Sequence, residues 1–238
     1  AAIVFSAAQA LGATPAQMVS WMWALGIGMG VTSLGLSLWY RQPVLTAWST
    51  PGAAVLAVSQ GVNLPEATGA FMVCGLLIIA VGYSGWFERL MSKIPLALAS
   101  ALLAGVLARF ALDAVGAVAH APVLVLAMTL AYLLGRRWWP RYAVPGVLVA
   151  GIAVAAIQGR VALGGVDWAW ATPVWVTPQF SLGSVVGVAL PLFIVTMASQ
   201  NLPGVAAIRA AGYTMPISRL ITLTGLVTLV LAPFGAFA

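Results

Sequence analysis

The sequence predicts an all-α polytopic membrane protein, and two observations carry that prediction. Of its 238 residues 63% are apolar and only 6% are charged, whereas a soluble domain has about 25% charged residues. Apolar runs of about 20 residues, the length that a helix needs to cross the hydrocarbon of a membrane, recur along the chain. This composition excludes soluble enzymes and nucleic-acid binders, and the single cysteine, Cys74, excludes an intrachain disulfide.

Nine segments are expected, separated by proline, glycine or charged residues. The first is too short to cross a membrane and the last is still apolar where the sequence stops, so we expect an internal fragment of a longer transporter. The segments are expected at residues 1–11, 16–38, 43–61, 66–85, 95–113, 121–136, 143–158, 181–208 and 217–238.

Local signals support the first complete spans. Thr14 and Pro15 introduce the segment 16–38 as a helix cap followed by proline at the first helical position. Glu66 opens the segment 66–85, where a carboxylate stabilises a helix N-terminus. A face of small residues, which favours close packing between membrane helices, is expected in the segment 16–38 from Gly26, Gly28, Gly30 and Gly35.

The later segments have similar boundaries. Pro95 opens the segment 95–113, in which Arg109 and Asp113 are four residues apart near the outer end and are expected to pair. Arginines follow the segment 121–136. The stretch 160–180 is rich in tryptophan, proline and threonine and is too polar to span, so we expect an outer segment that is either re-entrant or interfacial.

The lysines and arginines predict the orientation of the segments. If the first segment runs from inside to outside, the inner loops hold eight of the ten and the outer side holds Arg160. Cytoplasmic loops of membrane proteins usually carry such an excess, so the net charge of +6 reflects topology and not a nucleic-acid site. The eight inner residues are Arg41, Arg89, Lys93, Arg136, Arg137, Arg141, Arg209 and Arg219.

The segment 43–61 shows the pattern of a substrate site. β-Favouring residues after Pro43 lead into Ser49-Thr50-Pro51-Gly52, which indicates an extended stretch followed by a half-helix. Non-helical backbone at membrane depth occurs where it is buried in protein or lines a cavity. The start of a half-helix favours an anion, because its N–H groups are free and the helix dipole is positive there. The alternative is a proline kink repaired by neighbouring helices.

The segment 181–208 carries neutral polar side chains within an apolar helix. Ser199, Gln200 and Asn201 lack hydrogen-bond partners in lipid and must face protein, water or substrate. Together with Pro203 and Gly204 they predict a second interruption of a helix. The alternative is that they only form hydrogen bonds between helices.

A faint internal repeat relates the two interruptions. The run AQALG at 8–12 resembles the run SQNLP at 199–203; Gln9 precedes Pro43 by 34 residues and Gln200 precedes Pro233 by 33. The two copies have opposite orientations in the predicted topology. Secondary transporters with inverted repeats place their substrate at the repeat interface, so Gln9 is a candidate substrate-binding residue beside Gln200.

Three blocks of sequence carry a family resemblance. They read IVFSAAQALGA at 3–13, RQPVLTAWSTPGAAVL at 41–56 and LPLFIVTMASQNLPGVAAIRAAGY at 190–213. These blocks closely resemble the bacterial benzoate:proton symporter family (BenE-like), which is distantly similar to the uracil-permease-type nucleobase transporters. The similarity extends over essentially the whole chain.

The resemblance implies a partial 7+7 inverted-repeat transporter, from part of helix 1 through helix 9, in which a short extended stretch breaks helix 3. It implies that residues 1–85 form helices 1–4 of a core domain and that residues 86–158 form helices 5–7 of a gate domain. An outer interfacial segment at 159–180 and the core helices 8–9 at 181–238 would complete the chain.

The resemblance also implies the site. Residues 48–50 would lie in the helix 3 stretch, and residues 199–201 at the helix 8 position where the nucleobase transporters carry a glutamate. An amide there suits an anionic substrate, because a buried carboxylate would repel it whereas an amide can donate to it. The ring of Trp48, with that of Phe5, would stack on an aromatic acid. The expected substrate-binding residues are Gln9, Trp48, Ser49, Thr50, Ser199, Gln200 and Asn201.

We therefore expect a secondary active transporter of a bacterial inner membrane that imports an aromatic carboxylate, benzoate, with protons by alternating access. The alternative is an anion channel, or an uncoupled anion or nucleobase exchanger, on the same fold. One histidine and four scattered acids provide no catalytic or metal-binding cluster, so neither an enzyme nor a cofactor is expected. The expected partners are the substrate, protons and the lipid bilayer, without nucleic acid; a homodimer is left open.

Overall fold

The computed structural model of the protein describes residues 2–59, 61–92, 108, 111–161 and 170–237. Every regular element in these residues is helical, which confirms the predicted all-α class. The expected segment 95–113 lies largely outside the described residues, and so does Arg109, the expected partner of Asp113. Five helical stretches are long and apolar enough to cross a membrane: Pro15–Tyr40, Leu64–Tyr83, Pro140–Ile157, Leu182–Ala210 and Ile217–Phe234.

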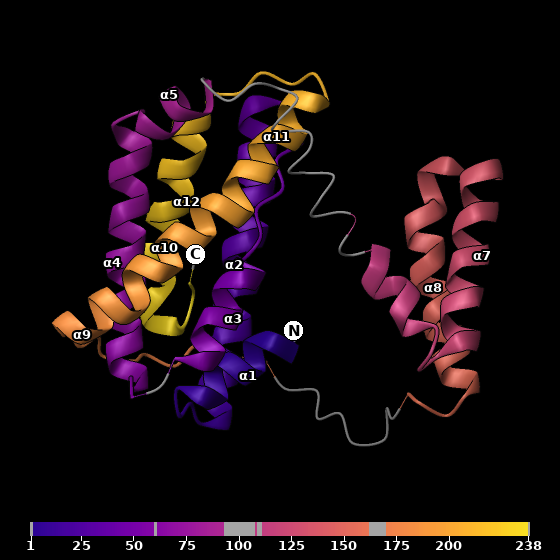
Figure 1. The fold of residues 1–238 in the computed structure, drawn as a ribbon, viewed down its shortest axis with the longest axis horizontal. Helices are drawn as coiled ribbons and strands as arrows, with labels where there is room; N and C mark the ends of the chain where they lie inside the picture. The colour runs from indigo at the N-terminus through magenta and orange to yellow at the C-terminus, as the bar shows by residue number, and fades with distance from the viewer. Residues whose placement is uncertain (1, 60, 93–107, 109–110, 162–169, 238) are drawn as a thin grey trace. The chain divides into compact units, whose positions relative to one another are not determined.

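The helices are shown in Figure 1. In chain order they are α1 (Ala2–Ala10), α2 (Pro15–Tyr40), α3 (Thr50–Val58), α4 (Leu64–Tyr83), α5 (Trp86–Ser92), α7 (Pro122–Trp138), α8 (Ala143–Ile157), α9 (Leu182–Ser184), α10 (Leu190–Thr196), α11 (Leu202–Ala210) and α12 (Ile217–Leu231). Two π-helical turns, Val185–Ala189 and Met197–Asn201, join α9, α10 and α11 into one continuous helix.

The chain divides into two compact units, one formed by residues 1–102 with 170–238 and the other by residues 103–169. In the first unit α12 packs along α4, α1 packs on α3, and α10 contacts both α3 and α4. In the second unit α7 and α8 form a hairpin that is closed by a 3₁₀ turn at Pro140–Tyr142. The candidate site described below lies entirely in the first unit.

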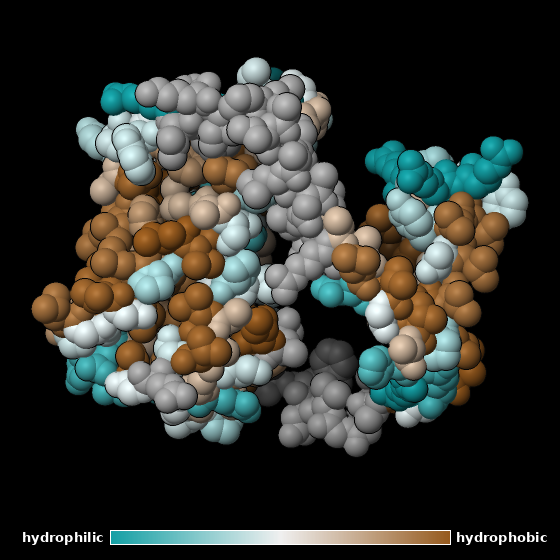
Figure 2. Space-filling view, viewed as in Figure 1, coloured by the Kyte–Doolittle hydropathy of each residue, from teal (hydrophilic) through white to brown (hydrophobic). Residues whose placement is uncertain are grey.

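Both units expose apolar side chains. On α2, Leu34 and Leu38 are 64% and 69% exposed, and on α8 Val149 and Ile152 are more than half exposed. Figure 2 shows broad hydrophobic surfaces on each unit, with hydrophilic residues gathered at the ends. Because these side chains would be unfavourable in water and are suited to lipid, the surface agrees with a membrane-spanning chain.

One end of the first unit is rich in arginine. The C-terminal ends of α2 and α11, the whole of α5 and the N-terminal end of α12 lie together at that end (Figure 1). These positions hold Arg41, Arg89, Arg209 and Arg219. All four belong to the set predicted to face the cytoplasm, so their common location agrees with the predicted orientation.

Two helix starts in the first unit are stabilised by carboxylates. At the start of α4, Asn63 Oδ1 accepts from the Glu66 N–H at 2.9 Å and Glu66 Oε2 accepts from the Asn63 N–H at 3.3 Å, a reciprocal capping box. At the start of α12, Glu88 of α5 accepts from the hydroxyl and the backbone N–H of Ser218, at 2.6 and 3.3 Å. A negative charge beside a helix N-terminus is favourable, and the second contact ties α5 to α12.

Glycines allow α4 and α12 to approach closely. A Cβ atom built on Gly82 of α4 would lie 2.7 Å from the backbone nitrogen of Thr222, and one on Gly225 of α12 would lie 3.0 Å from the backbone nitrogen of Ile79. The backbones therefore approach closely, with the side chains of Thr222, Ile78 and Ile79 packed against the two glycines, as small residues permit in membrane helix pairs.

Only one of the four glycines expected to form a packing face on α2 contacts another helix among the described residues. Gly28 packs against Leu231 and Val227 of α12, whereas Gly26, Gly30 and Gly35 have no described side chain or backbone within 4 Å of a built Cβ. Close packing through glycine is thus found on α4, where Gly75 and Gly82 share a face seven residues apart.

Residues 170–181, directly before α9, are not helical, and they follow the surface of the first unit. The Val176 N–H donates to the Pro233 carbonyl at 2.8 Å, and the Gln179 N–H donates to the Pro65 carbonyl at 2.9 Å. Gly69 of α4 lies directly beneath the Gln179 backbone. These contacts satisfy backbone groups that would otherwise be unpaired.

Candidate functional site

A cavity of about 210 Å³ lies within the first unit. It is lined by α2, the non-helical residues 44–48, Ile78 of α4, the end of α10 with the π-helical turn that follows it, α11, α12 and the residues that follow α12. Cavities of about 150 Å³ in other protein cores hold a benzene ring, so this one has room for a small aromatic molecule. Most of its wall is aliphatic, including Leu25, Ile78 and Leu220.

Polar groups are few in the cavity and uncharged. No residue that lines it, among those the structure describes, carries a charge. A charged ligand in such a space would have to be stabilised by neutral donors, since burial of an unpaired charge is costly. The polar residues that line the cavity are Thr32, Thr46, Thr196, Gln200, Asn201, Thr224 and Thr228.

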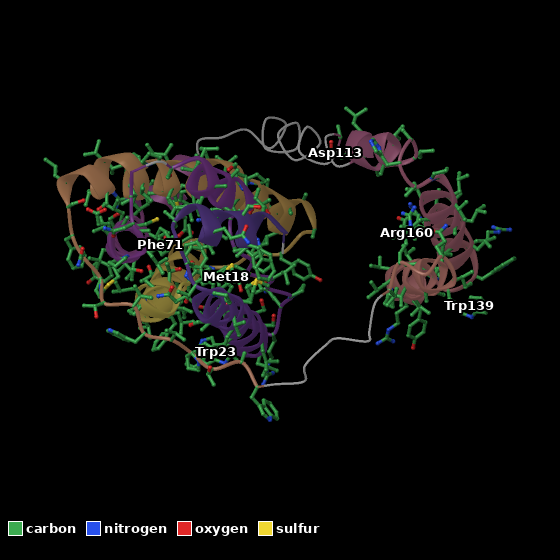
Figure 3. The ribbon with its side chains drawn as sticks, turned by 90° about the horizontal axis from the view of Figure 1, so that it is seen from below. Met18, Trp23, Phe71, Asp113, Trp139 and Arg160 are labelled. Carbon is green, nitrogen blue, oxygen red and sulfur yellow. The ribbon has the colours of Figure 1, made fainter. Side chains whose placement is uncertain are left out.

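Three buried aromatic rings support one wall. Phe237, which lines the cavity, packs against Trp21 of α2 and Phe71 of α4, with ring centroids 5.8 Å apart in both cases. The rings of Trp21 and Phe71 are 5.6 Å apart in an edge-to-face arrangement. Figure 3 labels Phe71 among the side chains inside the first unit. Edge-to-face packing of buried rings is favourable and restricts their motion.

The second wall is the non-helical segment 43–49, between α2 and α3. It folds back along α2, and the hydroxyls of Ser33 and Ser37 hydrogen-bond its backbone. Trp48 lies near its end, lines the cavity and is half-buried. The segment thus brings an indole ring to the cavity wall.

The start of α3 follows this segment. Ser49 is fully buried and caps the helix, its hydroxyl accepting from the Gly52 N–H at 3.0 Å. Thr50 is the first helical residue and is exposed. Gly52 lies so close to Leu192 of α10 that a Cβ atom would be 2.6 Å from the leucine methyl. These residues hold α3 in place and do not line the cavity.

The third wall contains the π-helical turn Met197–Asn201. Gln200 and Asn201 both line the cavity, although neighbouring positions on a regular α-helix point about 100° apart. A π turn is wider and occurs often at functional sites. It also keeps the backbone hydrogen-bonded, so the helix continues through the polar residues without the interruption expected from the sequence.

The structure brings three of the seven expected site residues to one cavity: Trp48, Gln200 and Asn201. Ser199 is directed to its own helix, where its hydroxyl donates to the Val195 carbonyl. The other three do not line the cavity: Ser49 caps α3, Thr50 is exposed beside it, and Gln9 is exposed on α1. Phe5, the second expected ring, is also exposed on α1 at 40%.

Sequence reasoning missed the threonines of the cavity. Thr224 and Thr228 of α12 both line it, and Thr32 of α2 does so as well. The two threonines of α12 are four residues apart within an apolar span, which places their hydroxyls on one face of the helix. That spacing is a readable signal, since hydroxyls in a membrane helix need a partner.

Comparisons with known proteins relate the whole chain to one family. The family model described as benzoate membrane transport protein (BenE) matches residues 1–238. The inner membrane protein YdcO of Escherichia coli K12 is 50% identical over 239 residues, which cover all of this chain and 61% of that protein. The benzoate membrane transport protein of Acinetobacter baylyi is 37% identical over 237 residues, which cover 99% of this chain and 59% of that protein.

The chain therefore spans about three-fifths of the length of these curated relatives. No solved structure matches the chain. The names of the relatives agree with the bacterial inner membrane location expected from the sequence, and the helices of the structure agree with a multi-pass protein.

Proposed function

From the premise that the chain belongs to the benzoate membrane transport family (BenE), we propose that it forms the substrate site of a secondary transporter. The proposed substrate is an aromatic carboxylate, benzoate, imported together with protons by alternating access. The observation that supports this most directly is an uncharged cavity with an indole ring on one wall and two primary amides on another.

The chemistry of the cavity suits benzoate. The aliphatic and aromatic wall would take the ring, and Trp48 would pack against it. The amide of Gln200 can donate to a carboxylate. So can the amide of Asn201, which keeps one N–H for a substrate while its Nδ2 donates to Met197 Sδ at 3.0 Å. An acidic side chain in the same position would repel the anion, and the described lining residues contain none.

The inverted repeat is part of the proposal. Two stretches that follow prolines, Val44–Trp48 and Ala236–Phe237, would correspond in the two copies. Val44, Trp48, Ala236 and Phe237 all line the same cavity, as the two non-helical elements of an inverted repeat do at a substrate site. Their meeting supports the repeat that the spacing from Gln9 and Gln200 predicts.

The two domains and their roles are proposed as well. Residues 1–85 and 181–238 would form the core that holds the substrate, residues 86–158 the gate, and residues 159–180 an outer segment between them. The division of the chain into a unit of residues 1–102 with 170–238 and a unit of residues 103–169 supports this assignment. Motion of one domain against the other would alternate access to the site.

The test is transport by the full-length protein in liposomes. With an acidic exterior and an alkaline interior, we expect saturable accumulation of labelled benzoate that a protonophore abolishes. Protein-free liposomes are the control, because neutral benzoic acid crosses a bilayer unaided and must be subtracted. Saturable flux that does not respond to the pH gradient would instead support an uncoupled exchanger, and current far above carrier rates would support a channel.

The ring of Trp48 gives a separate prediction. Trp48→Ala is expected to raise the KM for benzoate several-fold, because an aromatic pair contributes about 0.5–1.5 kcal/mol beyond the area it buries. Trp48→Phe keeps a ring and is expected to stay within about twofold of the wild type. Initial rates of saturable uptake would be measured over a range of benzoate concentrations, and equal KM values for the two variants would contradict a stacking role.

A further inference from the structure

No strand lies beside the segment 43–49 in the described part of the chain, and two serines of α2 form the hydrogen bonds that a neighbouring strand would form. Ser37 Oγ accepts from the Val44 N–H and donates to the Val44 carbonyl, both at 3.0 Å. Ser33 Oγ accepts from the Thr46 N–H at 3.0 Å and lies 2.9 Å from the Thr46 hydroxyl. Each serine therefore forms hydrogen bonds with one residue of the segment. The residue between Val44 and Thr46, Leu45, has no such bond to either serine.

The spacing explains why this pairing works. Ser33 and Ser37 are four residues apart on α2, a rise of about 6 Å at 1.5 Å per residue. Val44 and Thr46 are two residues apart, a rise of about 6.6 Å for an extended chain. The two distances agree closely enough for both serines to reach the segment. The segment runs antiparallel to α2, since Val44 pairs with Ser37 and Thr46 with Ser33.

Burial along the segment alternates accordingly. Val44 is buried and Thr46 and Trp48 are half-buried, whereas Leu45 and Ala47 are exposed. Alternation of period two is the pattern of an extended chain with one face covered. A slip of one residue would exchange the two faces and would put Ala47 at the half-buried position of Trp48, although Leu45 and Ala47 also border the cavity from their exposed positions.

The hydroxyl of Thr46 strengthens the same register. It lies within hydrogen-bonding reach of both the Thr32 hydroxyl and the Met29 carbonyl, the latter at 3.3 Å, and its single proton can be donated to one of the two. Thr32 in turn donates to the Gly28 carbonyl at 2.6 Å. Thr46 thus contacts α2 at several points. If the segment shifted by one residue, Leu45 or Ala47 would take the position of Thr46, and these hydrogen bonds would be lost.

We propose that Ser33 and Ser37 are positioning residues for the substrate site, which set the register of the segment 43–49 and thereby direct Trp48 to the cavity. The proposal rests on the proposed transport function for its effect on substrate, but not for its effect on the segment. Neither serine lines the cavity, so their influence on the substrate passes through Thr46 and Trp48.

The first experiment reports on the segment alone. Val44→Cys would be introduced into the full-length protein in a background in which Cys74 and any cysteine outside this sequence are replaced by alanine. Residue 44 is buried, so we expect slow reaction with a maleimide. Adding Ser33→Ala and Ser37→Ala is expected to speed the reaction at least tenfold, and equally slow labelling would overturn the proposal.

The second experiment reports on the substrate. The double alanine variant is expected to raise the KM for benzoate about tenfold and to reduce discrimination against a benzoate with a bulky para substituent. Ser33→Thr with Ser37→Thr keeps both hydroxyls and is expected to restore KM and discrimination. An unchanged KM and unchanged discrimination in the alanine variant would contradict the positioning role.

Controls separate the possible failures. Ser59→Ala removes a hydroxyl that donates only to the Val55 carbonyl of its own helix at 2.8 Å among the described contacts, and it is expected to behave as the wild type. If the double variant does not fold, Ser37→Ala alone tests the Val44 contacts by the same labelling. If the wild type transports no benzoate, the proposed function fails, while the maleimide result still decides whether the serines set the register.

Discussion

Gln200→Ala is expected to raise the KM for benzoate by roughly 10- to 100-fold, with expression and maximal rate close to those of the wild type. Gln200 lines the cavity from the π-helical turn, where its amide would donate to the substrate carboxylate. Hydrogen bonds to charged groups contribute about 1.5–3 kcal/mol, and each 1.4 kcal/mol is about tenfold in affinity. The measurement is saturable uptake into liposomes at equal amounts of protein.

Two variants sharpen this prediction. Gln200→Glu keeps the shape but would place a carboxylate against the substrate, so we expect a larger loss than with alanine. Ser199→Ala is the matched control, since that hydroxyl donates to the Val195 carbonyl of its own helix and does not line the cavity. Equal losses of uptake and of folded protein with Gln200→Ala would show instead that the amide has a structural role.

Gly69→Ala is expected to lower the thermal stability of the purified protein by roughly 5–10 °C. The added Cβ atom would lie 2.1 Å from the carbonyl oxygen of Gln179, and the Gln179 N–H is bound to the Pro65 carbonyl at 2.9 Å. A backbone segment would have to move away from α4, and overpacking of this kind costs about 1–3 kcal/mol. The same shift would break a backbone hydrogen bond.

Cys74 provides the measurement. It is fully buried in α4, so its thiol should react with a fluorescent maleimide only as the protein unfolds. Gly26→Ala is the control: no atom of the described residues lies within 4 Å of its added Cβ atom, and alanine favours a helix over glycine by about 1 kcal/mol. Labelling curves of the two variants that coincide would contradict the close approach of Gln179 to α4.

Most of the helical boundaries followed from local chemistry. The cap and proline at Thr14 and Pro15 predicted the start of α2, and Glu66 marked the first turn of α4. Such signals involve only neighbouring residues, so they can be read without the fold. The start of α3 at Thr50, directly after Ser49, is of the same kind, because a serine cap and a following proline act within one turn.

The close helix contacts could not be read in the same way. Glycines occur along both α2 and α4, but Gly75 and Gly82 are the ones whose backbones meet α12. A glycine is identified as a contact point only by the partner that approaches it, and the partner is about 140 residues further along the chain. Of the four glycines expected to pack on α2, only Gly28 has such a partner on α12 among the described residues.

The sequence by itself determined the class of the protein, the family and the chemical character of the site. Scarce charge required a membrane fold, and polar residues within apolar helices had to face something other than lipid. The class and the polar positions depend on composition and on spacing along one helix, whereas the family follows from three blocks of sequence that resemble it.

The tertiary structure decided which of those polar residues share a cavity. Gln9, Ser49, Thr50 and Ser199 were expected there, but a cap, an exposed face and a hydrogen bond within one helix turn them elsewhere. Thr224 and Thr228 lie there because α12 packs along α4 and faces the segment 43–49 across the cavity. A pocket depends on contacts between segments far apart in the chain, and only the folded arrangement of those segments shows them.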